Sequence, residues 1–138
     1  MCRKIKIEEI NDVIKILHQE SLRYADGSYP EELWIKNFFN KKRGYILGYY
    51  KENVLVAVLI AESLLDGGTM LWYIAVSPEN KRKGYGGILL EYFEKVAKSR
   101  NRTWIFLNAT PDSVDFYKKK GFVTNESAKV FEHFKEIL

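Results

Sequence analysis

A strand, a helix and a second strand follow one another between Thr69 and Asn108, and this unit constrains the fold more than any other part of the sequence. The apolar run from Thr69 to Val76 stops before Pro78, and a second apolar run covers Thr103 to Asn108. Between them, apolar residues recur at helical spacing from Gly84 to Arg100. Two strands joined by a helical crossover lie parallel in one sheet. We therefore expect a parallel pair inside a mixed central sheet.

The remaining segments predict hairpin strands and further helices around this unit. Asp66-Gly67-Gly68 is a strong hairpin signal before the strand that starts at Thr69. Further strands are expected at Arg3–Ile7, Gly44–Tyr50, Val54–Glu62, Phe122–Val123 and Lys129–Phe134, and further helices from about Glu9 to Tyr24, from Pro30 onward and from Asp112 to Lys120. The order β-α-α-β-β-β-α-β-α-β-β predicts one α/β (α+β) domain over residues 1–138, a length that leaves little room for a second.

The composition is that of a soluble globular protein, with 46% hydrophobic, 29% charged and 14% aromatic residues. The only cysteine is Cys2, which excludes an intramolecular disulfide. Cys2, His18 and His133 are too scattered for a zinc cluster, so no metal is expected. The first residues do not read as a signal peptide, and the longest apolar run, Val54–Ala61, is far too short to span a bilayer. We expect a cytoplasmic location without membrane contact.

Positive charge is clustered along the chain. The net charge is +4, the first quarter is acidic, and basic clusters lie at residues 41–43, 81–83, 98–102 and 118–120. Such clusters are usually solvated surface, and their functional alternative is a site for an anion, either a phosphorylated cofactor or nucleic acid. The acidic first quarter argues against nucleic acid.

The turn between the strand ending at Val76 and the following helix has the composition of a phosphate site. Three cations precede a glycine cluster there, in the order Lys81-Arg82-Lys83-Gly84-Tyr85-Gly86-Gly87. Glycine lets the backbone approach a ligand, and the first amides of a helix have no intrahelical partner. Together with the helix dipole and the cations, these amides suit a pyrophosphate. Two better-known phosphate loops are excluded, because the later glycine of the dinucleotide fingerprint and the Gly-Lys-Ser/Thr of a P-loop are missing.

This turn resembles the pyrophosphate-binding motif of the GNAT superfamily of N-acetyltransferases, which reads Arg or Gln, two residues, Gly, one residue, then Gly or Ala. Lys81 stands where the family usually has Arg or Gln and keeps the charge without the planar fork. Gly87 stands where Ser or Thr is common. A second stretch, Ser113 to Phe122, resembles the family's Ala-x-x-Phe-Tyr-x-Lys-x-Gly-Phe, with Ser113 in place of alanine and Thr110 where asparagine is frequent. The two motifs in this order are specific together.

The resemblance implies a GNAT-type mixed sheet with helices on both faces, in which the two central parallel strands splay apart around the pantetheine arm. These would be the strands ending at Val76 and Asn108. Contacts with acetyl-CoA, as the acyl-donor substrate, are implied for Ile74, Ala75, Val76, Lys81, Arg82, Lys83, Gly84, Tyr85, Gly86, Gly87, Asn108, Ser113 and Phe116. Tyr117 matches the family's general acid, which would protonate the departing thiolate. The general base stays open between Glu62, Tyr73 and a water chain.

The implied activity is transfer of an acetyl group to a primary amine by direct attack in a ternary complex. The alternative is a CoA-binding regulatory domain without turnover, whereas the two cofactor motifs oppose a nucleic-acid-binding module. By resemblance, the loop Tyr24–Tyr29 is the acceptor gate, Asp26, Glu31 and Glu32 suit a cationic amine, and the helix carrying Trp34 walls the acceptor pocket. The acceptor is a small-molecule or peptide amine. Its identity, the acyl chain length and the choice between monomer and homodimer stay open.

Overall fold

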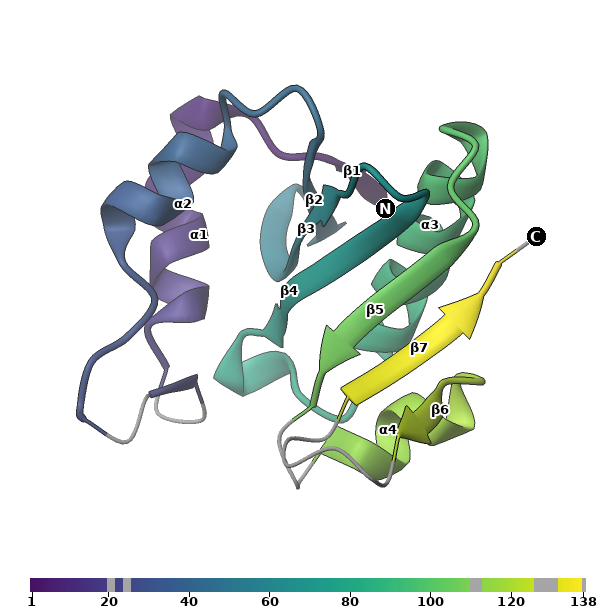
Figure 1. The fold of residues 1–138 in the computed structure, drawn as a ribbon. Helices are drawn as coiled ribbons and strands as arrows, with labels where there is room; N and C mark the ends of the chain where they lie inside the picture. The colour runs from purple at the N-terminus through teal and green to yellow at the C-terminus, as the bar shows by residue number, and fades with distance from the viewer. Residues whose placement is uncertain (20–21, 24–25, 110–112, 126–131, 138) are drawn as a thin grey trace.

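The computed structural model describes residues 1–19, 22–23, 26–109, 113–125 and 132–137, and its centre is a seven-stranded sheet (Figure 1). The strands follow the order β1-β2-β3-β4-β5-β7-β6 across the sheet. Their bounds are Cys2–Lys4 (β1), Gly44–Lys51 (β2), Val54–Ser63 (β3), Gly68–Val76 (β4), Trp104–Asn108 (β5), Val123–Asn125 (β6) and Glu132–Glu136 (β7). All neighbouring strands are antiparallel except β4 and β5, which form the expected parallel pair.

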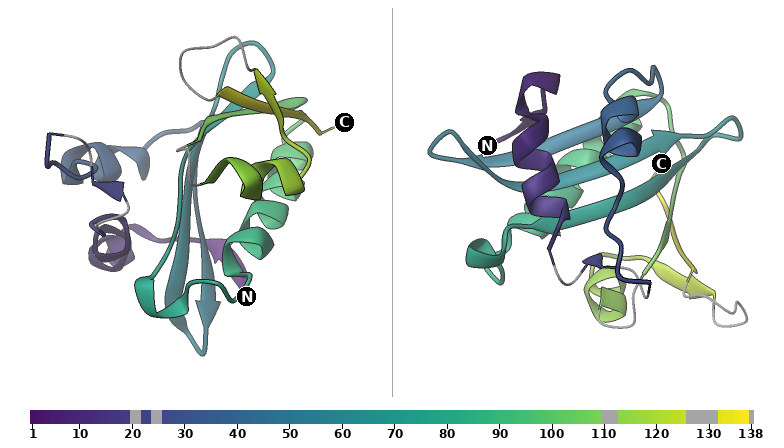
Figure 2. Two further views of the ribbon diagram at one scale, coloured as in Figure 1. Left: turned by 90° about the horizontal axis from the view of Figure 1, so that it is seen from below. Right: turned by 90° about the vertical axis from the view of Figure 1, so that its left-hand side faces the viewer.

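Helices cover both faces of the sheet, which gives three layers (Figure 2). One face carries α1 and α2 and the other carries α3 and α4, with bounds Ile10–Leu17 (α1), Glu32–Phe38 (α2), Tyr85–Ser99 (α3) and Val114–Lys119 (α4). Successive side chains of a strand point to opposite faces. Accordingly, Leu59 of β3 belongs to the buried cluster under α3, and its neighbour Ile60 belongs to the cluster under α1 and α2. The element order and the mixed α/β class are those that the sequence predicts.

The first helix is shorter than the sequence predicts. It ends at Leu17 instead of near Tyr24, a residue that lies outside the described part of the chain. The side chain of Gln19 folds back, and its Nε2 donates to the backbone oxygen of Ile16 at 2.7 Å. The Ile16 carbonyl therefore accepts from a side chain, whereas in a longer helix it would accept from the backbone amide four residues later.

Several other elements differ from expectation at their ends, most by one or two residues. β1 ends at Lys4 instead of Ile7, because Ile7–Glu9 form a 3-10 turn that leads into α1. α2 starts at Glu32, shortly after Pro30. β7 ends at Glu136, beyond the expected Phe134, whereas residues 129–131 of the expected strand lie outside the described residues.

The parallel pair separates halfway along β4. Its pairing with β5 runs only from Gly68 opposite Trp104 to Leu71 opposite Leu107, although β4 continues to Val76. At the same point the register with β3 shifts, since Ile60 lies opposite Tyr73 while Ala61 lies opposite Leu71. Trp72 is therefore a bulge residue, and a bulge bends the strand that carries it. The bulge coincides with the end of the parallel pairing, and we call the place where β4 continues without β5 the splay.

Candidate active site

The segment between β4 and α3 exposes backbone amides at the start of a 15-residue helix. After a 3-10 turn at Pro78–Asn80, the chain takes left-handed conformations at Arg82 (φ 64°) and Gly84 (φ 83°). Gly84 is the cap residue of α3, so no side chain caps the first amides, and no acidic residue lies in the first turn. The positive end of the helix dipole thus meets the exposed cations of residues 81–83. This combination favours an anion.

Gly86 brings the two sequence motifs into contact. A Cβ placed on it would lie 3.6 Å from Cγ2 of Val76 and 4.0 Å from Cζ of Phe116. The end of β4, the first turn of α3 and the helix α4 therefore meet at one point. Three of the residues that the sequence assigns to the cofactor site are neighbours here.

Lys120 places a further cation beside the start of α3. The sequence pattern predicts only a solvated lysine at the end of a helix for this residue. Its Nζ lies 2.9 Å from the position that a Cβ on Gly87 would take, so its side chain reaches across the first turn of α3. This contact depends on the packing of α4 beside α3, for which the local sequence holds no signal. The glycine at position 87 leaves the space that the lysine amine occupies.

The part of β4 without a β5 partner contains Ile74, Ala75 and Val76. Ile74 and Val76 pack toward α3, and Ala75 packs toward the cluster under α1 and α2. The carbonyl of Val76 accepts a hydrogen bond from Nε2 of Gln19 at 3.0 Å, which fixes the end of the strand against α1. The sequence did not point to Gln19, because a glutamine that bridges two distant elements leaves no local pattern. Beyond Leu71, this edge has the backbone groups with which an extended ligand pairs.

Tyr117 of α4 is buried in the cluster under α3. It is 7% exposed, and its ring centroid lies 5.1 Å from that of Phe116 and 5.6 Å from that of Phe122. Burial raises the pKa of its phenol above the ordinary value. The hydroxyl therefore stays protonated at neutral pH and can donate a proton or a hydrogen bond.

Three further residues predicted to contact the cofactor lie on β5, directly before α4 and at the start of α3. Asn108 is the exposed last residue of β5, and Ser113 is half-buried directly before α4. The ring of Tyr85 stacks on Tyr49, with centroids 4.7 Å apart, and is held against β2. Because the ring is engaged in this way, Tyr85 would contact an anion through its backbone amide at the start of α3. Thr110 lies outside the described residues.

The two candidate bases occupy different places. Glu62 lies near the end of β3, opposite Met70 in the part of β4 that still pairs with β5. Its Oε2 forms an ion pair with Nζ of Lys41 at 3.0 Å. Tyr73 directly follows the Trp72 bulge, and its ring contacts Trp34 with centroids 5.5 Å apart. Of the two residues, Tyr73 is the one beside the splay.

Aromatic rings also mark the α2 side of the splay. Trp34 meets Trp72 edge to face at 6.2 Å, and Trp72 is 43% exposed. In the predicted gate, Asp26 accepts hydrogen bonds from the amide (2.9 Å) and the hydroxyl (2.6 Å) of Ser28, which lower the pKa of its carboxyl. Tyr24 lies outside the described residues. The surface beside the splay is therefore aromatic, and the described acid of the gate is turned toward its own loop.

Two other kinds of chemistry would need a metal centre or a reactive thiol among the described residues. No three His, Cys, Asp or Glu side chains there gather closely enough to hold a metal ion. The thiol of Cys2 is half-buried, and burial raises its pKa against the opposing effect of the N-terminal ammonium. In the same part of the chain, no helix has both the length and the apolar character needed to cross a membrane.

The splayed strand edge, the uncapped amides and the cationic turn are features of α/β proteins that bind a phosphorylated ligand beyond the carboxyl ends of parallel strands. A family model described as "Acetyltransferase (GNAT) family" matches residues 11–122. The chain belongs to this family.

Solved structures with the same fold cover nearly the whole chain. The PaiA N-acetyltransferase from Thermoplasma acidophilum, solved in complex with coenzyme A, has a TM-score of 0.84 at 19% identity and covers 99% of this chain and 98% of its own. Ard1 from Thermoplasma volcanium gives 0.84 at 18%, covering 100% and 97%. The ribosomal-protein-S18-alanine N-acetyltransferase from Escherichia coli gives 0.80 at 16%, covering 99% and 93%. A comparison with curated protein sequences found no match.

Proposed function

We propose that this protein transfers an acetyl group from acetyl-CoA to a primary amine by direct attack in a ternary complex. The observation that carries the proposal is the part of β4 that has no β5 partner after the Trp72 bulge, directly beside the uncapped start of α3. An extended pantetheine arm fits such an edge, and a pyrophosphate fits such a helix start.

In this proposal the diphosphate of acetyl-CoA lies on the amides of residues 85–87, with the cations of residues 81–83 and Lys120 around it. The pantetheine pairs with the backbone of Ile74, Ala75 and Val76. Asn108, Ser113 and Phe116 border the arm from the β5 and α4 side. The coenzyme A complex of the Thermoplasma acidophilum protein supports this ligand class for the fold.

The chemistry requires a neutral amine, a donor for the oxyanion and a proton for the sulfur. The amine nitrogen attacks the thioester carbon, the C–N bond forms, and the C–S bond breaks to leave a thiolate. A backbone amide at the end of β4 would donate to the oxyanion. The base that takes the amine proton is Tyr73 or a water chain at the splay, since Glu62 is engaged by Lys41 before the splay.

Tyr117 acts in this scheme as hydrogen-bond donor to the departing sulfur. Its raised pKa lies above that of an ordinary thiol, about 8.5, so complete transfer of its proton to a thiolate is uphill. The proton that the amine nitrogen loses on attack replaces the one that the sulfur gains, so a neutral amine and acetyl-CoA give the amide and the CoA thiol without net release of a proton. The burial that weakens the phenol as an acid also excludes water from the thiolate.

We expect Tyr117→Phe to lower kcat about 100-fold, because the variant loses the donor but keeps the ring packing. The dissociation constant for CoA should change less than about twofold. Release of free CoA from acetyl-CoA across a panel of primary amines measures the first value, and calorimetric titration measures the second. Tyr92→Phe, on a half-buried tyrosine of α3, is the matched control. Equal turnover of wild type and Tyr117→Phe would remove Tyr117 from the mechanism. CoA binding without turnover on any amine would favour the regulatory alternative.

Lys120→Gln tests the cation that only the structure indicates. We expect the affinity for CoA to fall about tenfold, because a charge-assisted contact with phosphate is worth roughly 1.5–3 kcal/mol. Lys119→Gln removes the same charge from an exposed neighbour on the same helix and should leave the affinity unchanged. Equal losses in both variants would mean that Lys120 contributes only to the general field of the surface.

A further inference from the structure

A second pocket lies at the end of the sheet opposite the proposed cofactor site. It has a volume of about 300 Å³ and is bordered by the end of β3, the β3–β4 hairpin and the segment between α3 and β5. It adjoins the start of β4 at Gly68, whereas the cofactor site is at Val76, about 26 Å away along the strand. The cofactor chemistry makes no use of this pocket.

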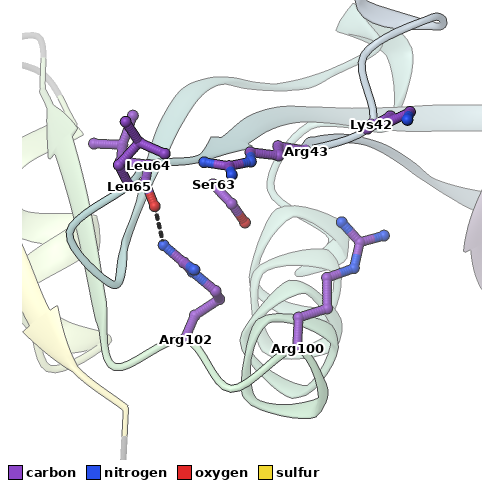
Figure 3. A pocket seen from close by; sticks show the side chains of 7 residues that line it. All are labelled: Lys42, Arg43, Ser63, Leu64, Leu65, Arg100 and Arg102. Carbon is purple, nitrogen blue, oxygen red and sulfur yellow. Dashed lines mark hydrogen bonds between the residues drawn. The ribbon is translucent and has the colours of Figure 1, made fainter.

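Four cations line this pocket, and no acidic residue is among its lining residues in the described part of the chain. They are Lys42 and Arg43, which precede β2, and Arg100 and Arg102, which lie between α3 and β5. Figure 3 shows the three arginine side chains around one space, with Lys42 at its edge. Among the described residues, the ion pairs of the structure join Arg3 to Glu9, Lys41 to Glu62 and Lys135 to Glu94, and none involves a cation of the pocket lining. The positive charge of the lining is therefore not neutralised by an ion pair there.

Two of the arginines are held in place by contacts that leave donors available. The guanidinium of Arg100 lies 4.1 Å above the Tyr45 ring and donates to the Gly44 carbonyl at 3.4 Å. Nη2 of Arg102 donates to the Leu64 carbonyl (Figure 3). It also donates to the Gly68 carbonyl at 2.7 Å. Ordered arginines lose little entropy when they bind an anion.

The Nε atom of Arg102 is buried without a hydrogen-bond partner in the described structure. An atom without accessible surface cannot itself reach a ligand in the pocket, so this unsatisfied donor is a cost of holding Arg102 in place and not a contact with the anion.

Helix capping does not explain this cluster. The last carbonyls of α3 already accept hydrogen bonds from the amides that follow: Val96 and Ala97 from Arg100, Lys98 from Asn101, and Ala97 again from Arg102. The helix dipole places roughly half a negative charge at the end of α3. The four cations carry more positive charge than this, so the dipole leaves positive charge that an anionic ligand can balance.

We propose that this pocket binds a small multivalent oxyanion, either free phosphate or diphosphate or the phosphoryl group of a small molecule. The volume admits one or two phosphoryl groups. The planar guanidinium donors match phosphate oxygens in pairs. This site is independent of the acetyl-CoA site and does not depend on the proposed acetyltransfer.

The test titrates inorganic phosphate, inorganic pyrophosphate and phosphoserine into protein saturated with CoA, which closes the other phosphate site. Saturable binding with a rise in Tm is expected, because a ligand that binds the native state stabilises it. Arg43→Gln and Arg100→Gln should each weaken this binding at least tenfold. Arg43 is exposed, so its replacement leaves the fold and the CoA affinity intact. Binding of phosphoserine as tight as that of phosphate would identify a carried phosphoryl group, and its absence a free ion.

Lys98→Gln is the matched control, because it removes the same charge from an exposed residue in the last turn of α3 that does not line the pocket. Its phosphate affinity should equal that of the wild type. Binding that does not saturate, or that falls equally in Lys98→Gln and Arg43→Gln, would overturn the proposal and leave only a diffuse positive surface. The comparison of these two variants assigns the binding to this pocket whether or not CoA is present.

Discussion

Buried polar atoms without partners mark positions where a single residue works against the fold. Thr69 of β4 is completely buried, and its Oγ1 has no hydrogen-bond partner in the described structure. Its methyl group and β-branched shape suit a strand, but its hydroxyl has lost water without a replacement. Thr69 therefore contributes packing while its polar atom lowers the stability of the sheet.

Thr69→Val should raise the free energy of unfolding by about 1 kcal/mol, because it keeps the shape and removes the unsatisfied oxygen. Urea denaturation at neutral pH measures the change. Thr103→Val serves as the contrast, since Oγ1 of Thr103 has the Gly67 carbonyl at 3.5 Å, and this variant should gain no stability. A loss of 1 kcal/mol or more in Thr69→Val would show that the buried hydroxyl has a partner.

At the scale of elements, the order of helices and strands was predictable from the sequence because their signals are local. Pro78 and the glycines after Lys83 mark the end of a strand and the start of a helix, and the two motifs place the cofactor residues on them. What the sequence missed depends on contacts between distant segments. The Trp72 bulge exists only relative to β3 and β5, and Gln19 and Lys120 act through elements far from them in the chain. Such pairings leave no periodic pattern.

The start of α3 depends on the backbone of one glycine. Gly84 has φ 83°, and no atom lies within 4 Å of the position of an added Cβ, so only conformational strain opposes a side chain there. Gly84→Ala should lose about 1 kcal/mol of stability and weaken CoA binding, because relief of the strain would turn the first amides away. Gly84→Asn should retain most of both, since asparagine tolerates the left-handed region better. Thermal unfolding and CoA titration measure the effects, and equal behaviour of the two variants would contradict this account.

At the scale of the whole molecule, the first nine residues close one edge of the sheet. The N-terminal ammonium donates to the Tyr50 carbonyl at 2.8 Å, and the guanidinium of Arg3 lies 3.8 Å from the centre of the Tyr50 ring. Glu9 joins these groups, because its carboxylate accepts hydrogen bonds from Arg3 (3.0 Å), the Lys6 amide (2.8 Å) and the Tyr50 hydroxyl (2.8 Å). An edge strand of three residues is thus tied to β2 and to the start of α1 by one polar cluster.

This cluster makes the stability of the molecule depend on pH in the acid range. Burial opposes ionisation of Glu9, but the three hydrogen bonds and the charge of Arg3 outweigh it and lower the pKa of the carboxyl to about 2. A carboxyl with a lower pKa in the folded state stabilises the fold above its unfolded pKa, near 4.3. That contribution is lost as the pH falls from about 4.3 toward 2.

Glu9→Gln should therefore lower the free energy of unfolding by about 1 kcal/mol at pH 7, a value kept small because the two charged side chains are 36% and 21% exposed. The difference from the wild type should shrink as the pH approaches 2, where the wild-type carboxyl is itself becoming protonated. Urea denaturation at several pH values between 2 and 7 measures both trends. Glu8→Gln removes the same charge from an exposed neighbour and should change stability by less than about 0.5 kcal/mol throughout. A Glu9→Gln effect that stays constant down to pH 2 would mean that packing of the side chain, and not its charge, holds the N-terminal segment to the sheet.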